Sequence, residues 1–128
     1  AIKWYKKHYK LLPDGIILLQ PTTPFRSISH FRKCINKFSI SNKSIISVKN
    51  VNTVFKDIYF KKKNNLKILK EHDFFIPNGS MYILNTHDFL KFKSINKIKK
   101  SFFEMNGRYN LDIDYPHQYL LANQIASK

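Results

Sequence analysis

The most constraining feature of this chain is an aliphatic run that stops at a glutamine. Residues 15–26 read GIILLQPTTPFR, so the run leads into Gln20 and then into a Pro-Thr-Thr-Pro segment. Near-continuous aliphatic runs are typical of parallel strands that are buried on both faces. Open α/β sheets bind their ligands at the ends of such strands. The pattern therefore predicts a buried parallel strand over 15–20 whose end, at Gln20, faces a ligand.

A second pattern lies almost a hundred residues further along, where residues 111–114 read LDID. Alternate side chains of a strand point to the same face, so a short strand here would place Asp112 and Asp114 side by side. Two neighbouring carboxylates repel each other unless a cation lies between them, and a hard divalent metal suits oxygen ligands. The spacing alone is equally compatible with a solvated Asp112 and with Asp114 complementing the N-terminus of the following helix.

The segment between these two patterns, residues 75–84, reads FIPNGSMYIL. Asn78 and Gly79 suit a tight turn, and the apolar residues after them predict a strand over 80–84. In this order the three segments resemble the acylneuraminate cytidylyltransferases, the family of CMP-sugar synthetases. Its members carry a strand ending LLQPTSPLR, then an NGAIYI strand, then a DIDTPEDL segment that opens the last helix. The resemblance covers about residues 2 to 126.

Apolar periodicity predicts the other elements and an α/β fold class. The expected helices cover residues 2–12, 27–38 and 86–92, the last capped by Thr86, and a final helix opens at Pro116. Further strands are expected over 44–48 and 102–105, and a lysine-rich loop over 93–100. The helix over 27–38 should bury one stripe of side chains, formed by Ile28, Phe31, Ile35 and Phe38 with Cys34 beside them.

The length of 128 residues predicts one domain that is large enough to bury a core. Alternating strands and helices predict right-handed crossovers. The resemblance implies a Rossmann-like nucleotidyltransferase sheet of the nucleotide-diphospho-sugar transferase type, with flanking helices.

A hairpin excursion is predicted in the middle of the chain, because residues 54–60 and 66–69 flank a basic KKKNN tip at 61–65. A comparable excursion in the family reaches a partner subunit. The resemblance therefore implies a homodimer of the full-length protein through residues 54–77. Its apolar contact would come from Ile58, Tyr59, Phe60, Phe74 and Phe75.

Composition excludes several classes of protein. Apolar residues make up 43% of the chain and aromatic residues 15%, which argues against disorder. No apolar run approaches the roughly 20 residues that cross a bilayer, and no signal-peptide pattern is visible. The single cysteine, Cys34, excludes an internal disulfide framework and suits a reducing compartment. These features predict a cytoplasmic protein that binds no membrane.

The formal charge of +15 raises the alternative of a basic nucleic-acid-binding module. The basic residues of this chain are almost all lysines, however, with arginine only at positions 26, 32 and 108. Base and phosphate recognition favours the rigid fork of arginine. The charge is therefore interpreted as a lysine-rich solvated surface, which would still attract an anionic nucleotide and an acidic sugar.

A glycine-rich phosphate loop is absent from this sequence. Such loops need clustered glycines so that backbone N–H groups can approach a phosphate, and here the glycines are isolated at positions 15, 79 and 107. The family carries a PARGGSK-type loop after its first strand, which holds CTP. We therefore expect an N-terminally truncated domain that lacks the nucleotide-binding front and has little or no activity alone.

The resemblance also implies roles for six residues. Asp112 and Asp114 would be the catalytic pair that holds Mg²⁺, while Gln20, Asn78 and Tyr82 would contact the sugar. Arg26 would either pair with the sugar carboxylate or fix its loop. From its position alone, Gln20 could equally be a buried amide bonded to nearby backbone. Tyr115 replaces the hydroxyl that caps the last helix in the family.

The implied reaction joins CTP to a nonulosonic, sialic acid-like sugar and releases pyrophosphate. Sialic, legionaminic and pseudaminic acids all remain open as the sugar. A different class of function is a short form that binds the sugar or dimerises without catalysis.

Overall fold

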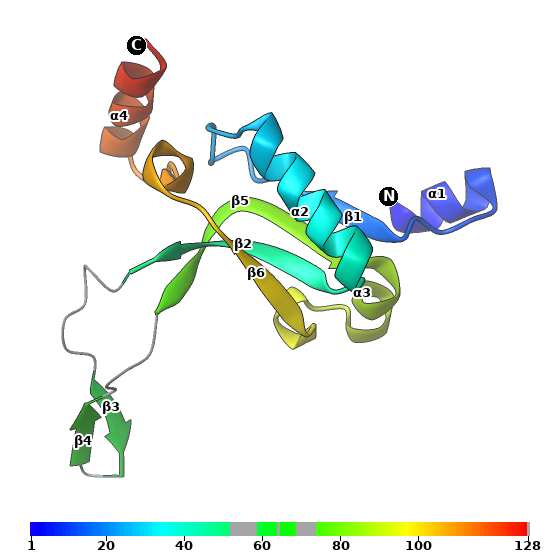
Figure 1. The fold of residues 1–128 in the computed structure, drawn as a ribbon, viewed down its shortest axis with the longest axis horizontal. Coiled ribbons are helices and arrows are strands. Elements are labelled where there is room, and N and C mark those ends of the chain that lie inside the picture. The colour runs from blue at the N-terminus through cyan, green and yellow to red at the C-terminus, as the bar shows by residue number, and fades with distance from the viewer. Residues whose placement is uncertain (52–58, 64, 69–73, 128) are drawn as a thin grey trace.

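The computed structural model describes residues 1–51, 59–63, 65–68 and 74–127. They form an α/β fold with a mixed four-stranded sheet and flanking helices, compatible with a Rossmann-like domain (Figure 1). The helices are α1 (Ile2–Tyr9), α2 (Ile28–Ser41), α3 (Thr86–Phe92) and α4 (Pro116–Ala126), with short 3-10 turns η1 (Ile95–Lys97) and η2 (Gly107–Asn110). The strands are β1 (Gly15–Leu18), β2 (Ser44–Asn50), β3 (Tyr59–Lys62), β4 (Asn65–Ile68), β5 (Phe75–Asn85) and β6 (Lys100–Glu104).

The larger sheet has the strand order β1-β5-β2-β6. Strand β5 runs antiparallel to both β1 and β2, whereas β2 and β6 are parallel. Strands β1 and β2 therefore share one direction, and α2 connects them across the sheet, as Figure 1 shows. This connection brings the ends of β1 and β2 to the same region of the sheet.

The prediction of a buried parallel strand over 15–20 is wrong in three respects: its length, its direction and its burial. The strand ends at Leu18, and its partner β5 is antiparallel to it, with Gly15 opposite Asn85 and Leu18 opposite Tyr82. The strand is also at the edge of the described sheet, where Ile17 and Leu18 keep 43% and 42% of their surface exposed. An aliphatic run signals hydrophobic faces but not the direction of the neighbouring strand.

The core lies between α2 and the sheet. Its buried residues are Cys34, Ile45, Met81, Ile83 and Met105, with Phe31, Phe38, Phe103 and Tyr109 packed around them. The α2 stripe is therefore centred on Phe31, Cys34 and Phe38, which recur three and four positions apart. Burial raises the pKa of the Cys34 thiol to about 11, as expected for a core cysteine.

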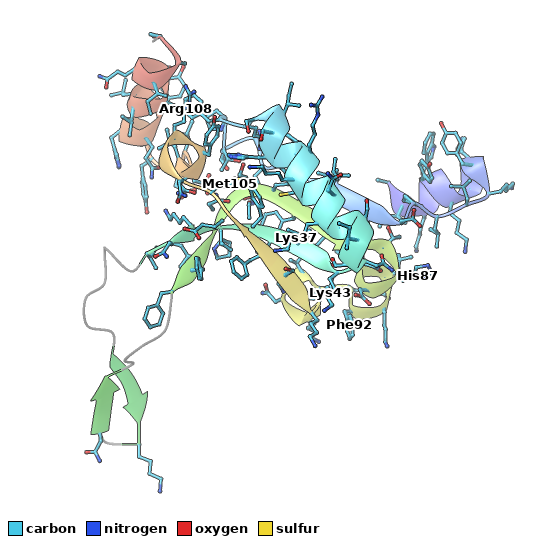
Figure 2. All side chains as sticks on the ribbon, in the orientation of Figure 1. Lys37, Lys43, His87, Phe92, Met105 and Arg108 are labelled. Carbon is cyan, nitrogen blue, oxygen red and sulfur yellow. The ribbon has the colours of Figure 1, made fainter. Side chains whose placement is uncertain are left out.

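The predicted stripe was too wide, because Ile28 and Ile35 are 72% and 41% exposed. Both lie on the flank of the helix away from Cys34, beyond the reach of the sheet. On the other side, Lys37 Nζ donates a hydrogen bond to Phe102 O at 2.8 Å and so ties α2 to β6 (Figure 2).

Strand β5 is longer than predicted and contains a large bulge. From Ile46 to Val48, β2 advances two positions, while the opposite residues on β5 run five positions, from Tyr82 to Pro77. The extra residues of β5 bulge out of the ladder, and Gly79 within them has a φ of +73°. The Asn78–Gly79 pair is thus a bulge inside a continuous strand, and not the tight turn that the sequence predicts.

Two smaller predictions also need correction. Helix α3 is capped by Asn85, whose Oδ1 accepts a hydrogen bond from Asp88 N at 3.1 Å, and Thr86 is the first helical residue. The expected loop over 93–100 contains η1, and β6 begins at its last residue, Lys100.

The predicted hairpin is confirmed, since β3 and β4 form a separate two-stranded antiparallel sheet, but its tip is shorter than expected, because Lys61, Lys62 and Asn65 belong to the strands. Residues 54–58 and 69–73 lie outside the described residues, as do Ile58 and the side chains of Tyr59 and Phe60. Phe75 packs its ring 5.1 Å from that of Phe102. Contact of this excursion with a partner subunit stays a prediction. Among the described helices, none has the length and apolar character required to cross a bilayer.

Replacing an isoleucine in the core should lower the free energy of unfolding far more than replacing an isoleucine on the exposed side of α2. We expect Ile45→Ala to cost about 2–5 kcal/mol, because Ile45 is only 1% exposed and its removal leaves a cavity. Ile40→Ala is the matched control, since Ile40 is 88% exposed and should change stability by less than about 0.5 kcal/mol. Urea unfolding followed by circular dichroism measures both, and equal losses would contradict the assigned core.

Candidate functional site

The three sequence patterns meet at the α-carbon of Gly79. A Cβ atom built there would collide with Oε1 of Gln20 and lie 3.1 Å from Oδ2 of Asp112. It would also lie 3.2 Å from Cγ2 of Thr23. The loop after β1, the bulge of β5 and the segment before α4 therefore converge at one point. Glycine is required there both by the positive φ and by this close approach.

The loop after β1 is fixed by Thr23, which is completely buried. Thr23 Oγ1 lies 3.0 Å from Gln20 O and 3.3 Å from Gly79 O, and it joins the loop to the bulge of β5. Thr23 N also donates to Gln20 O at 3.3 Å. These contacts hold the Gln20 backbone against β5 and leave its side-chain amide directed at Gly79.

Arg26 ties the same two segments together. Its Nε donates to Ser80 O at 3.2 Å, and its Nη2 donates to Gln20 O and, at 2.9 Å, to Thr23 Oγ1. Partial burial lowers the pKa of this guanidinium. Of the two roles considered for Arg26, these bonds correspond to fixing the loop. Its contact with a sugar carboxylate stays a prediction.

Asn78 is part of the bulge, and its side chain is 2% exposed. Its Oδ1 accepts hydrogen bonds from Ser47 Oγ at 2.6 Å and from Ser80 N at 3.2 Å. Its Nδ2 donates to Asn110 Oδ1 at 2.9 Å. As placed, the side chain supports the bulge from inside, and its predicted contact with a ligand is untested.

Tyr82 and Asp112 are close enough to influence each other. Burial raises the pKa of the half-buried Tyr82 phenol, and the negative charge of Asp112 raises it further. Met81 and Ile83 point into the core beneath α2, so Tyr82 between them points to the opposite face of the sheet. Because its pKa is raised, the Tyr82 phenol stays protonated at neutral pH and can donate a hydrogen bond near Asp112.

The strand expected over 111–114 is not formed. The segment is irregular, and its recorded tie to the Gln20 loop is one hydrogen bond, from Ile113 N to Thr22 O at 2.9 Å. Asp112 is half-buried, and its Oδ1 is a buried atom without a hydrogen-bond partner in the described structure. A carboxylate oxygen that has lost both water and a partner is energetically costly. Asp114 is exposed.

Helix α4 is capped by a residue that the sequence reasoning missed. Gln118 Oε1 accepts hydrogen bonds from Asp114 N at 2.7 Å and from Tyr115 N at 2.8 Å. Gln118 is the third residue of the helix, a position from which glutamine reaches back to the cap, so its spacing from Tyr115 was the available signal. The cap also fixes the backbone that carries Asp114. Within the described residues, no cluster of three or more His, Cys, Asp or Glu forms a metal site.

Comparison with known proteins finds a distant similarity to a cytidylyltransferase. No family model matches the chain. It is similar to an N-acylneuraminate cytidylyltransferase of Escherichia coli O18:K1:H7 (strain RS218 / NMEC), with 27% identity over 131 aligned positions. The alignment covers 90% of this chain and 30% of that protein, so the chain spans less than a third of the relative's length. This distant similarity agrees with the motif resemblance and supports a relationship to that class of protein.

The convergence at Gly79 can be tested with a matched pair of glycine substitutions. Gly79 and Gly107 both have positive φ, at +73° and +60°, so an alanine at either position carries similar backbone strain of roughly 1 kcal/mol. A Cβ at Gly107 meets nothing within 4 Å, whereas one at Gly79 collides with Gln20. Because the Gln20 amide can rotate away while Asp112 and Thr23 must shift by only a little, we expect Gly79→Ala to destabilise the protein by about 1 kcal/mol more than Gly107→Ala in urea unfolding. Equal effects would show that Gln20 and Asp112 do not crowd this position.

Proposed function

We propose that this chain forms the acid-sugar and metal-binding part of a CMP-sugar synthetase. The reaction is transfer of CMP from CTP to a nonulosonic, sialic acid-like sugar, with release of pyrophosphate. The observation that carries the proposal is the meeting of Gln20, Asp112 and the Gly79 bulge at one point. The distant similarity to an N-acylneuraminate cytidylyltransferase supports the same reaction class.

The carboxylates fit a magnesium ion of the kind that is shared with a substrate. Mg²⁺ binds through one or two protein carboxylates and completes its shell with waters and substrate phosphates. Asp112 offers a buried oxygen without a partner, and Asp114 offers an exposed carboxylate two residues on. These two residues would hold the ion. Bound Mg²⁺ supplies electrostatic stabilisation of the phosphate charge during transfer.

The protein's own groups act by binding and orienting the sugar. The Gln20 amide can donate and accept hydrogen bonds, and its backbone is immobilised by Thr23 and Arg26. The protonated Tyr82 phenol offers a second donor on the side of Asp112. Phosphoryl transfer requires little covalent work from a protein, so a rigid placement of the attacking sugar hydroxyl accounts for much of the rate.

The net charge of the chain suits these substrates. The formal charge of +15 produces a positive field that raises the local concentration of anions. Both CTP and an acid sugar carry negative charge at neutral pH. The lysine-rich surface therefore assists their capture without a specific contact.

The first test is turnover. We expect this chain to form little or no CMP-sugar from CTP, Mg²⁺ and sialic acid, because the sequence holds no glycine-rich loop for the nucleotide. A chain extended upstream by a nucleotide-binding segment should be active in the same assay. If both chains form the CMP-sugar at equal, robust rates, the expectation that this chain needs a further nucleotide-binding segment is wrong. Sugar binding without turnover by either chain would favour a non-catalytic sugar-binding form.

The second test addresses the metal site without any substrate. Mn²⁺ binding can be measured by electron paramagnetic resonance, because the signal of free Mn²⁺ disappears when the ion binds. We expect the Mn²⁺ affinity to fall at least about tenfold in Asp112→Asn. Because this variant neutralises a carboxylate with an unpartnered buried oxygen, its Tm without metal should not fall.

Asp14→Asn is the matched control, since Asp14 is an exposed aspartate just before β1. It should bind Mn²⁺ as the unmodified chain does. Equal Mn²⁺ affinity in the Asp112 and Asp14 variants would refute the metal site.

A further inference from the structure

We propose that Asn110 is a positioning residue that sets the place of the Asp112 carboxylate at the Gly79 bulge. The role of Asp112 in this inference rests on the proposed function. The position of Asn110 does not, and no sequence pattern singled out this asparagine. Asn110 ends η2, two residues before Asp112.

The first part of the case is a chain of hydrogen bonds with one consistent direction. Ser80 N can only donate, so the oxygen of the Asn78 amide must face it, at 3.2 Å. The Asn78 nitrogen then faces Asn110 Oδ1 at 2.9 Å, and Asn110 Nδ2 faces Met105 O at 2.7 Å. Because Met105 O can only accept, both ends of the chain specify the same orientation of both amides. Asn110 therefore has one defined position.

The second part is the location of Asp112 between two anchors. On one side, Asn110 is bonded to β5 through Asn78. On the other side, Ile113 N donates to Thr22 O at 2.9 Å. Between them, Asp112 reaches to 3.1 Å from the Cβ position of Gly79. Of the two anchors, the one at Asn110 is made by a side chain and can be removed by substitution.

The third part is that η2 has independent support. The Tyr109 ring packs edge-on against His30 of α2 with centroids 4.5 Å apart, and Tyr109 also packs against the buried core. Figure 2 labels Met105 at the end of β6 and Arg108 in η2, on either side of the turn into this segment. Loss of the Asn110 amide should therefore loosen the segment that carries Asp112 while η2 and the core stay folded.

Amide hydrogen exchange of the whole chain, measured by NMR without metal or substrate, tests the inference. In Asn110→Ala, the exchange of the Ile113 amide should become about tenfold faster, because one anchor of its segment is lost. The Thr86 amide, which donates to Asp14 O at 3.1 Å near the other end of β1, should keep its rate. Asn106→Ala is the control: Asn106 is exposed, precedes η2 without a side-chain cap bond, and should leave both rates unchanged.

An unchanged Ile113 rate in Asn110→Ala would overturn the inference. So would a parallel increase at Ile113 and Thr86, because that result would assign Asn110 to general stability. If Asn110→Ala does not fold, Asn110→Ser, which leaves a smaller hydrogen-bonding group, is measured and interpreted in the same way.

Mn²⁺ titration of the unmodified chain separates this inference from the proposed function. If the chain fails to bind Mn²⁺ while Ile113 responds as predicted, the metal proposal falls and the positioning role of Asn110 stands. If the chain binds Mn²⁺, Asn110→Ala should bind it about tenfold more weakly, as is usual when the support of a metal ligand is removed. Unchanged affinity would contradict the positioning role.

Discussion

The absence of a side chain at Gly79 is the constraint on which the candidate site depends. The bulge of β5 places this residue at a φ of +73° and presents its bare α-carbon to Gln20, Thr23 and Asp112. Any Cβ there would displace at least one of these three side chains, which come from segments far apart in sequence. The side-chain amide of Asn78 stabilises the bulge through hydrogen bonds with Ser47, Ser80 and Asn110. The backbone of the bulge therefore determines how closely the side chains of the site can approach one another.

Around this point, most polar atoms are satisfied, and of the two buried oxygens without a partner in the described structure, Ser80 Oγ and Asp112 Oδ1, one belongs to a carboxylate. The guanidinium of Arg26 and the hydroxyl of Thr23 both donate to the carbonyl of Gln20, and the side chain of Gln118 accepts from the free N–H groups before α4. Asp112 Oδ1 is the contrasting case, a buried oxygen without a partner in the described structure. A buried carboxylate oxygen without a partner is energetically costly, and the proposed cation would offset that cost.

The sequence predicted the α/β class, α2, β2 and the β3–β4 hairpin, and its three motifs contain Gln20, Gly79 and Asp112, which lie together in the structure. It did so because apolar period and turn residues are local signals, and because the three motifs carry a family resemblance. The strand direction of β1 could not be predicted, since a run such as residues 16–19 indicates apolar side chains but neither their burial nor the direction of the neighbouring strand. The bulge at Gly79 was mistaken for a turn because Asn-Gly suits both, and only the register with β2 distinguishes them. Asn110 gave no pattern at all, because its role arises from a contact 32 residues away in the chain.

These features are the basis of the proposal that a sugar and a metal bind at the end of β1, and the distant similarity to an N-acylneuraminate cytidylyltransferase is consistent with that proposal. The central physical claim is that a cation held by Asp112 lies beside Gln20 and Gly79. Paramagnetic relaxation by stoichiometric Mn²⁺ tests it most directly, because the broadening of NMR signals falls steeply with distance from the ion. The account predicts strong broadening of the Gln20 side-chain amide and of the Gly79 backbone amide, with sharp signals for Ile40 on the exposed side of α2. Broadening that bypasses Gln20 and Gly79, or that spreads evenly over the lysine-rich surface, would contradict the account.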